Sequence, residues 1–222
     1  MKLYLDSADE RAWALPGGCP PVQGVTTNPS LVHQAGLPVT LATYERLLLA
    51  AAAQGMAELM LQLPRPDPAE ALAWQATLAE RASQLGVLLT LKLPCHPQWL
   101  PSIQALRPTG QTMLLTGLAN PVQLLWARAQ GAHFVAPYVG RLVADGREVW
   151  SLMQACVTVQ SAGGPALLAA SIKSPDVLTR LIACGAAAAT LPPASLVAWS
   201  HDELTLTAMG QFDRDTQASL QI

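Results

Sequence analysis

One lysine of this sequence lies near the end of an apolar run of strand length. Residues 87–94 read Val-Leu-Leu-Thr-Leu-Lys-Leu-Pro, and Gly86 precedes the run. Such a run is typical of a strand that is buried on both faces of a parallel sheet. An ammonium group in that position is costly unless it is paired or gives up its proton. Lys92 is therefore either a residue that snorkels out at the strand end or a functional amine.

Polar side chains also end most of the other predicted strands. The groups are a carboxylate, hydroxyls, amides and a phenol beside the amine: Asp6, Thr26 with Asn28, Gln62, Lys92, Thr116, Tyr138 and Ser171. The active sites of closed parallel barrels lie at these carboxyl ends of the strands. Polar groups also occur there simply because loops begin, but the convergence of so many different groups favours a site.

The chemistry that such a set of groups suits is that of a nucleophilic amine. Only roughly 1 in 2,500 lysines is neutral at pH 7 with an ordinary pKa, and burial lowers that pKa. A neutral Lys92 can attack a carbonyl, and the protonated Schiff base then lets an adjacent C–C bond break or form. Gln62, Thr116 and Tyr138 can hold one water as a proton shuttle. Asp6 suits a hydroxyl group of a polyol substrate, as does Asn28.

The elements that must position these residues alternate along the chain. Strands are predicted at residues 2–6, 22–27, 59–63, 87–94, 112–116, 134–139, 166–171 and 187–191. Helices are predicted at residues 7–15, 40–53, 67–85, 99–106, 121–131, 145–161, 175–185, 194–199 and 202–220. The alternation predicts a parallel sheet, and eight such units in 222 residues suit a closed (β/α)8 TIM barrel. An open doubly wound sheet is the alternative, but the first turn lacks its glycine-rich loop.

The composition excludes several classes of function. Hydrophobic residues make up 51% of the chain and charged residues 13%, and the formal net charge is −2. Without a basic surface, nucleic acid and anionic membranes are poor partners. No apolar stretch has the length of a membrane span, and the first residues do not read as a signal peptide. The four cysteines form no Cys-x-x-Cys pair, so we expect a cytoplasmic protein with free thiols and no metal.

Several of these segments, taken together and in order, resemble the transaldolase family and most closely its small fructose-6-phosphate aldolase branch. The matching pieces are Asp6, the run Gly-Val-Thr-Thr-Asn-Pro-Ser at 24–30, the lysine strand, Val-Ala-Pro-Tyr at 135–138, Arg141, and Ala-Ala-Ser at 169–171 with Lys173. The match covers most of the chain. The Thr-Thr-Asn-Pro-Ser segment is highly specific, and each of the other pieces is moderately so.

The resemblance implies a class I aldolase on a (β/α)8 barrel, with neither a metal nor another cofactor. Lys92 would form the Schiff base, and Asp6 would act in proton transfer and hold a hydroxyl of the donor. Gln62, Thr116 and Tyr138 would position the catalytic water.

The expected substrate-binding residues are Thr26, Asn28, Arg141, Ser171 and Lys173. Asn28 and Ser171 would bind the dihydroxyacetone unit. Arg141, helped by Ser171 and Lys173, would bind the phosphate of the acceptor aldehyde. The small members of the family are also similar in forming ring-shaped decamers. We therefore expect one barrel domain over residues 1–222, in which a helical extension at 201–222 packs on a neighbouring subunit.

Two alternatives to the aldolase reading remain open at this point. Gln62 and Tyr138 resemble the aldolase branch, whereas Gly140-Arg141 and the Ser-Ile-Lys run at 171–173 look more like transaldolases, which transfer dihydroxyacetone between sugar phosphates. A sugar-binding barrel without catalysis is the alternative from another class. A nucleophilic Cys95–His96 pair is disfavoured, because adjacent residues of an extended segment point to opposite sides.

Overall fold

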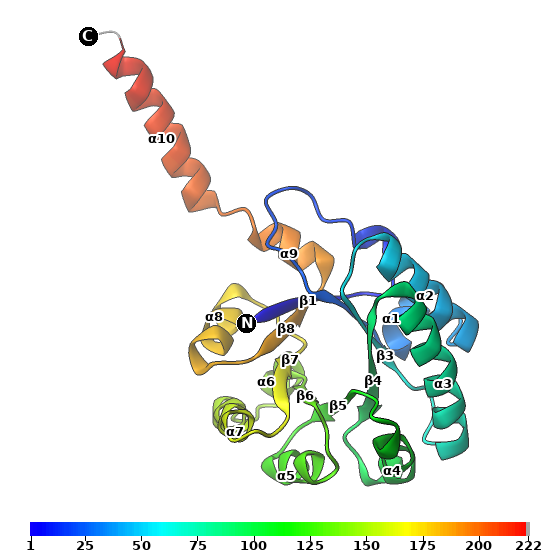
Figure 1. Ribbon diagram of the computed structural model, residues 1–222. Helices are drawn as coiled ribbons and strands as arrows, with labels where there is room; N and C mark the ends of the chain where they lie inside the picture. Colours follow the sequence, from blue (N-terminus) through cyan, green and yellow to red (C-terminus); the bar gives the residue numbers. More distant parts are fainter. Residues whose placement is uncertain (221–222) are drawn as a thin grey trace.

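Eight parallel strands pair in sequence order and close into a barrel, with β8 hydrogen-bonded to β1. The structure is a computed structural model and describes residues 1–220. The strands are β1 (Lys2–Asp6), β2 (Gly24–Thr26), β3 (Glu58–Gln62), β4 (Leu88–Pro94), β5 (Met113–Leu118), β6 (Phe134–Pro137), β7 (Ala166–Ala169) and β8 (Ala188–Leu191). Helices surround them (Figure 1). The predicted (β/α)8 fold is confirmed.

The helices begin and end largely where the sequence signals them. They are α1 (Pro29–Gln34), α2 (Leu41–Ala53), α3 (Pro68–Leu85), α4 (Leu100–Leu106), α5 (Pro121–Ala129), α6 (Val139–Ala144), α7 (Trp150–Ser161), α8 (Pro175–Cys184), α9 (Pro193–Trp199) and α10 (Glu203–Ser219). In α3, the Asp67 side chain accepts hydrogen bonds from the N–H groups of Ala69 and Glu70, and Gly86 ends the helix in the left-handed conformation. Such caps satisfy backbone groups that a helix end leaves free.

Two predictions in the first half of the chain need correction. Residues 7–15 were expected to be helical, but only the 3-10 turn η1 (Glu10–Ala12) forms, because Asp9 caps it from within the segment. Conversely, Asn28-Pro29 was read only as the end of a strand. Its asparagine accepts a hydrogen bond from the N–H of Leu31 and starts α1.

Two further corrections concern the region after β6. The strand predicted at 134–139 ends at Pro137, which has no N–H for the ladder. The chain then turns at Tyr138 into α6, which was not predicted. The helix predicted from residue 145 begins only at Trp150, because the carboxylate of Glu148 accepts hydrogen bonds from the N–H groups of Trp150 and Ser151.

Alternation along the strands decides which side chains enter the barrel. Leu61, Leu91 and Leu115 pack outward in the large core that the strands share with the helices. Their neighbours in the strands face inward, where Met60 and Leu114 belong to a second apolar cluster. By the same period of two, the polar residues that end several strands also face inward: Asp6, Thr26, Gln62, Lys92 and Thr116.

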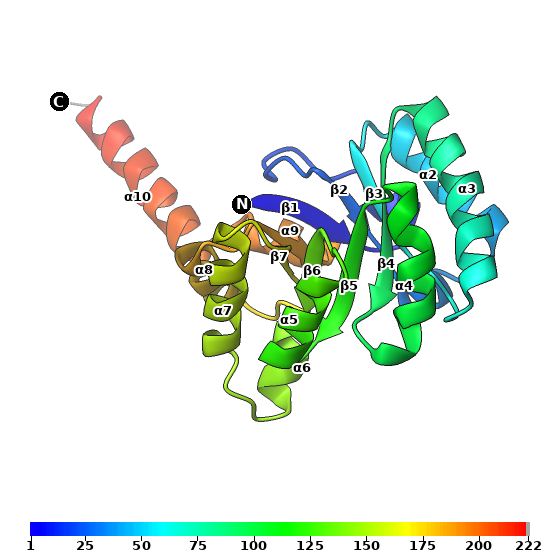
Figure 2. The same cartoon turned by 60° about the horizontal axis from the view of Figure 1, so that its bottom comes forward.

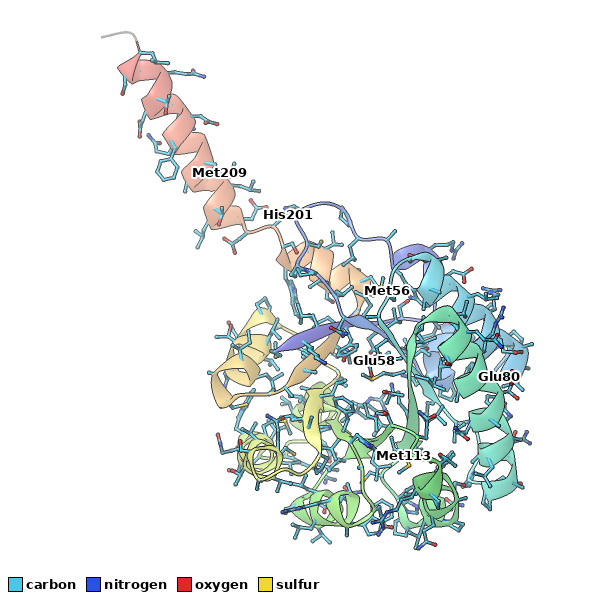
Figure 3. The ribbon with its side chains drawn as sticks, viewed as in Figure 1. Met56, Glu58, Glu80, Met113, His201 and Met209 are labelled. Atoms are coloured by element: carbon cyan, nitrogen blue, oxygen red, sulfur yellow. The ribbon has the colours of Figure 1, made fainter. Side chains whose placement is uncertain are left out.

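A buried carboxylate closes the opposite end of the barrel interior. Glu58, the first residue of β3, is 5% exposed and lies among the strands in Figure 3. Its two oxygens accept hydrogen bonds from the hydroxyls of Tyr4 and Thr90, each at 2.7 Å. Gly24 packs against it so closely that a Cβ there would lie 1.9 Å from the Glu58 carbonyl oxygen. We call Tyr4, Glu58 and Thr90 the floor cluster.

The helix α10 leaves the barrel and points away from it in both ribbon views (Figures 1 and 2). Within the described chain it buries none of its residues, although it carries apolar side chains. Leu204 is 81% exposed and Phe212 65%, and Met209 is visible on the free helix in Figure 3. The predicted extension is thus helical over Glu203–Ser219, and its last two residues, 221–222, lie outside the described part.

Among residues 1–220, no helix combines the length and the apolar character that a membrane crossing requires.

Candidate active site

A cavity of about 710 Å³ opens at the C-terminal ends of the strands, which we call the mouth of the barrel. All but two of the residues predicted from the sequence line it: Asp6, Asn28, Lys92, Thr116, Tyr138, Arg141, Ser171 and Lys173. Gln62 and Thr26 do not line the cavity and are packed in the wall beneath it. The mouth also includes Asp9, so charges of both signs surround it.

Lys92 is buried in the barrel interior and does not snorkel out. Its side chain lies in β4 beside Gln62 of β3, the residue is 5% exposed, and its Nζ donates a hydrogen bond of 2.7 Å to the carbonyl oxygen of Thr27. Burial lowers the pKa of Lys92 from 10.5 to about 8, and the negative charge of Asp6 opposes part of this effect. About one in ten of these amines is therefore neutral at pH 7, far more than with an ordinary lysine pKa, and the neutral form is the nucleophile.

Asp6 reaches the mouth from β1 and is tied to its neighbours by a hydroxyl chain. The Thr26 hydroxyl lies 3.1 Å from Asp6 Oδ1, to which it donates, and 2.7 Å from the Thr190 hydroxyl. Thr26 is fully buried, and these two side chains are the partners of its hydroxyl in the described chain. Thr26 therefore orients the carboxylate of Asp6 from below, and the carboxylate itself faces the cavity.

Tyr138 and Thr116 form a second pair of groups over the cavity. The Thr116 hydroxyl donates to the phenolic oxygen of Tyr138 at 2.8 Å, which leaves the phenolic proton free to be donated elsewhere. Nearby in the wall, the Oε1 atom of Gln62 is buried and has no hydrogen-bond partner in the described chain. A buried acceptor of this kind ordinarily binds a protein group or an ordered water. Thr116 and Tyr138 therefore offer a donor and acceptors to a water molecule in the cavity, and Gln62 Oε1 is an acceptor left open in the wall.

Asn28 lines the cavity with one half of its amide already engaged. Its Oδ1 accepts the N–H of Leu31 as the cap of α1. The amide nitrogen is left with both of its N–H donors for a ligand, and Oδ1 keeps a second lone pair. Asn28 thus suits a hydroxyl or carbonyl oxygen of a substrate.

Arg141 and Lys173 place two cations at the side of the mouth formed after β6 and β7. The Arg141 Cζ lies 4.6 Å from the centroid of the Tyr138 ring. Gly140 lies where a Cβ would come within 2.8 Å of Lys173 Cγ and 3.1 Å of Ser171 Oγ. The absence of a side chain at Gly140 therefore lets both side chains enter the same cleft.

Ser171 adopts a left-handed backbone conformation, with φ of 60°. Among the described residues other than glycine, it alone has a positive φ. Its carbonyl oxygen accepts the N–H of Gly140, and the Val139 N–H is donated to the Ala170 carbonyl, both at 2.9 Å. This two-bond bridge between the loops after β6 and β7 holds the strained residue. Strain of this kind costs on the order of 1–3 kcal/mol and is concentrated at functional sites.

Three residues of the site were missed from the sequence. Thr190 is the polar residue near the end of the eighth strand, and the rule applied to the other strands would have found it. The carbonyl of Thr27 and the bare backbone of Gly140 give no such signal, because their roles depend on contacts between distant segments.

Neither Cys95 nor His96 has the features of a nucleophile and its base. Burial raises the pKa of Cys95 to about 12, and its Sγ lies against the Gln123 carbonyl. The His96 Nδ1 accepts the N–H of Gln98 at the start of η2 (Pro97–Trp99). In the described residues, no three or more His, Cys, Asp or Glu side chains gather as they would around a metal ion.

The sequence is similar to proteins of one enzyme family along nearly its whole length. A family model described as Transaldolase/Fructose-6-phosphate aldolase matches residues 3–221. A "Probable transaldolase" of Dinoroseobacter shibae is 30% identical over 227 residues, covering 100% of this chain and 99% of its own. Another "Probable transaldolase", from Cereibacter sphaeroides, is 30% identical over 229 residues, covering 97% and 95%.

Solved structures with low sequence identity share the fold. One described as "Native KDPGal structure" has a TM-score of 0.53 at 12% identity and covers 99% of this chain and 95% of its own. A mandelate oxidase with (S)-2-phenylpropionate has a TM-score of 0.54 at 19% identity, covering 87% and 60%. These likenesses concern the barrel and not its chemistry.

Proposed function

Because the chain belongs to the Transaldolase/Fructose-6-phosphate aldolase family, we propose that it makes and breaks C–C bonds through a Schiff base on Lys92. The observation that carries this proposal is a buried amine with a pKa of about 8 at the mouth of the barrel. A buried lysine with a single carbonyl hydrogen-bond partner destabilises the fold, so its presence calls for a functional reason. Formation of an imine with the keto group of a sugar is such a functional reason.

In the cleavage direction, the neutral Lys92 amine adds to the keto carbon of the donor, and loss of water gives the protonated imine. Removal of the proton from the hydroxyl on the second carbon from the imine breaks the bond between the first and second carbons. The second carbon leaves as the aldehyde, and the protonated imine accepts the electron pair to become an enamine. Asp6 holds a donor hydroxyl, and the water between Gln62, Thr116 and Tyr138 carries the protons. Protonation of the enamine carbon and hydrolysis of the imine then free dihydroxyacetone and Lys92.

The substrate is a sugar phosphate in this proposal, and different residues of the mouth bind its two ends. Asn28 and Ser171 bind the dihydroxyacetone unit, and Arg141 with Lys173 binds the phosphate of the departing aldehyde. The planar guanidinium of Arg141 suits two phosphate oxygens at once. Glyceraldehyde 3-phosphate is the aldehyde that fructose 6-phosphate would release.

We favour net aldol cleavage and addition over transfer of the dihydroxyacetone unit. The hydroxyl of Tyr138, which accepts a hydrogen bond from Thr116, gives the water near the imine a partner and a proton donor. Delivery of that proton to the enamine releases dihydroxyacetone without a second sugar. The alternative, a transaldolase, is favoured by the names of the relatives and by the Gly140-Arg141 and Ser171-x-Lys173 pattern.

A product assay separates these possibilities. The protein is incubated with fructose 6-phosphate, with and without erythrose 4-phosphate, and free dihydroxyacetone is measured. We expect release without the second sugar. Transfer to erythrose 4-phosphate with no free dihydroxyacetone would assign the chain to the transaldolase reaction and leave the Schiff-base mechanism intact.

Borohydride reduction in the presence of dihydroxyacetone tests the Schiff base itself. Mass spectrometry should find the reduced adduct on the peptide that contains Lys92, and Lys92→Met serves as the control. A sugar-binding barrel without catalysis would give no adduct on either protein.

Substitutions at Tyr138 and Gln62, the two positions at which the aldolase and transaldolase branches differ, test which reaction the chain performs. Tyr138→Phe removes the proton donor and should depress cleavage, and adding Gln62→Glu should expose transfer activity. If the double variant still releases free dihydroxyacetone at the original rate, these residues do not decide between the two reactions.

We also propose that the chain assembles with copies of itself and that α10 packs on a neighbouring subunit. The exposed apolar side chains of α10 support this, since such a surface is rarely left in water. A ring-shaped decamer is the assembly expected from the family resemblance. Light scattering after gel filtration measures the mass, and a Leu204→Glu, Phe212→Glu double variant should reduce it.

A further inference from the structure

The structure joins the phosphate end of the mouth to its proton-handling end through one side chain. Tyr138 and Arg141 occupy a single helical turn, in which the Arg141 N–H is donated to the Tyr138 carbonyl at 3.0 Å. The guanidinium lies over the face of the Tyr138 ring, and the hydroxyl at the far end of that ring contacts Thr116. Arg141, the proposed phosphate ligand, therefore also contacts the ring that carries the proposed proton donor.

We propose that Arg141 is a positioning residue as well as an anchor, so that filling the phosphate cleft holds Tyr138 in place for proton transfer. This inference rests on the proposed function. It differs from simple anchoring in one measurable respect: an anchor lowers KM for phosphorylated substrates, whereas a coupled anchor also raises kcat, even when the phosphate is not attached to the substrate.

The ring of Tyr138 is half-buried, and a glycine rather than a residue with a side chain lies beside one of its edges. Gly117 has φ of 76°, and a Cβ there would contact the ring at 3.8 Å, but glycine supplies none. In the described structure, the ring is held by Thr116 at its hydroxyl and by Arg141 on its face. Loss of the guanidinium would leave the phenolic oxygen free to swing away from the water that it serves.

Without a ligand the guanidinium is only loosely held. Arg141 is exposed, and a long exposed side chain samples many rotamers. An anion bound between Arg141 and Lys173, which Gly140 brings into the same cleft, restricts the guanidinium to its place over the ring. Binding energy from the remote phosphate is then used to order the groups that react.

Phosphite, HPO₃²⁻, is a probe that fills such a cleft without being a substrate. It is added to the aldol reaction of dihydroxyacetone with glyceraldehyde, neither of which carries a phosphate. Because an exposed cation–π contact has a modest energy, we expect saturating phosphite to raise kcat roughly two- to fivefold. Arg141→Gln should abolish this activation. Lys173→Gln should raise the phosphite concentration needed but keep the activation.

Arg180 provides a matched control. Its Cζ lies 3.6 Å from the ring centroid of Trp150, a second cation–π pair outside the mouth. Arg180→Gln removes a similar contact and should leave the phosphite response as in the unmodified protein. Loss of activation in this variant as well would overturn the proposal, since the response would then follow general stability.

A double-variant cycle tests whether Arg141 acts through the hydroxyl of Tyr138. With phosphite present, Arg141→Gln should lower kcat roughly two- to fivefold in the unmodified background and hardly at all in Tyr138→Phe. Additive effects, or phosphite that only inhibits, would overturn the coupling while aldol turnover still supports the proposed function. No turnover with fructose 6-phosphate in any protein would overturn both.

Discussion

Each end of the barrel interior contains a buried ionisable side chain. The two ends differ in how completely this side chain and its polar neighbours are hydrogen-bonded. At the floor cluster, both oxygens of Glu58 accept a hydroxyl hydrogen bond. At the mouth, Lys92 has one carbonyl partner, and Oε1 of Gln62, its neighbour across the β3–β4 ladder, has none among residues 1–220. The floor is saturated with hydrogen bonds, whereas the mouth is not.

This difference in hydrogen bonding is the one expected if the floor cluster contributes to stability and the mouth to chemistry. A buried polar group that is fully hydrogen-bonded contributes to a unique fold, and one that is unsatisfied costs free energy. Unsatisfied groups are also the ones that can still bind a substrate or a water. This agrees with the division of labour in barrels, where the C-terminal end of the strands carries the site and the N-terminal end stabilises the fold.

The largest expected effect is on catalysis at the mouth. Lys92→Met removes the proposed nucleophile, and we expect turnover of fructose 6-phosphate to fall by on the order of 10⁴-fold or more. The assay measures dihydroxyacetone release, and circular dichroism checks that the variant is folded. Substantial turnover in this variant would place the nucleophile elsewhere and remove the contrast between the two ends.

At the floor cluster, Glu58→Leu should lower the free energy of unfolding without changing kcat of the folded protein. The substitution leaves the buried hydroxyls of Tyr4 and Thr90 unpaired, at roughly 1–3 kcal/mol each. Urea titration measures the free energy of unfolding, and kcat is measured on the folded fraction. Glu58→Gln, which can pair with both hydroxyls, is the control and should cost less. A large fall in kcat for either folded variant would mean that the floor takes part in catalysis.

The same Lys92→Met variant should be more stable than the unmodified protein. Holding the amine at a pKa of about 8 instead of 10.5 costs roughly 3 kcal/mol at neutral pH. The loss of the hydrogen bond to the Thr27 carbonyl offsets part of that gain, so we expect a net gain of roughly 1–3 kcal/mol.

The pH dependence of this gain has a definite sign. Between pH 8 and 10.5 the unfolded chain still binds a proton at Lys92 that the folded chain has released. The stability of the unmodified protein therefore rises toward that of the variant across this window. Urea titrations of both proteins at several pH values measure the difference, and a difference that does not change with pH would contradict the lowered pKa.

The smallest effect is expected at Gly140. A Cβ there would lie 2.3 Å from the Ser171 carbonyl oxygen, so Gly140→Ala must displace the loop that carries Ser171 and Lys173. We expect KM for fructose 6-phosphate to rise by on the order of tenfold. Gly17→Ala, at a position with open space around it, should leave KM unchanged. Equal changes in both variants would show that the cleft tolerates a side chain at Gly140.

The sequence alone predicted the barrel and most of the candidate mouth, because these depend on local signals. Each strand is a short apolar run between helix caps, and the polar residue at its end can be recognised without knowing the neighbours. Lys92 was found in this way. Since strand ends of a parallel barrel converge, the order of strands needed no further information.

What could not be predicted depends on contacts between segments. Tyr4, Glu58 and Thr90 belong to three different strands, and only the register brings them together. The left-handed turn at Ser171 is held by hydrogen bonds from the loop after β6. Nor does the spacing of Tyr138 and Arg141 reveal the contact between ring and cation, because α6 was read as part of a strand and a loop.

The free helix α10 has a consequence for how the chain folds. Isolated helices are marginal in water, and most of the stability of a helix comes from packing its apolar face. Within the described chain, α10 has no such packing. If a second copy covers it, the ordering of this segment is a bimolecular event, and its helix content depends on protein concentration while that of the barrel does not. Far-ultraviolet circular dichroism on dilution would then resolve two transitions within a single chain.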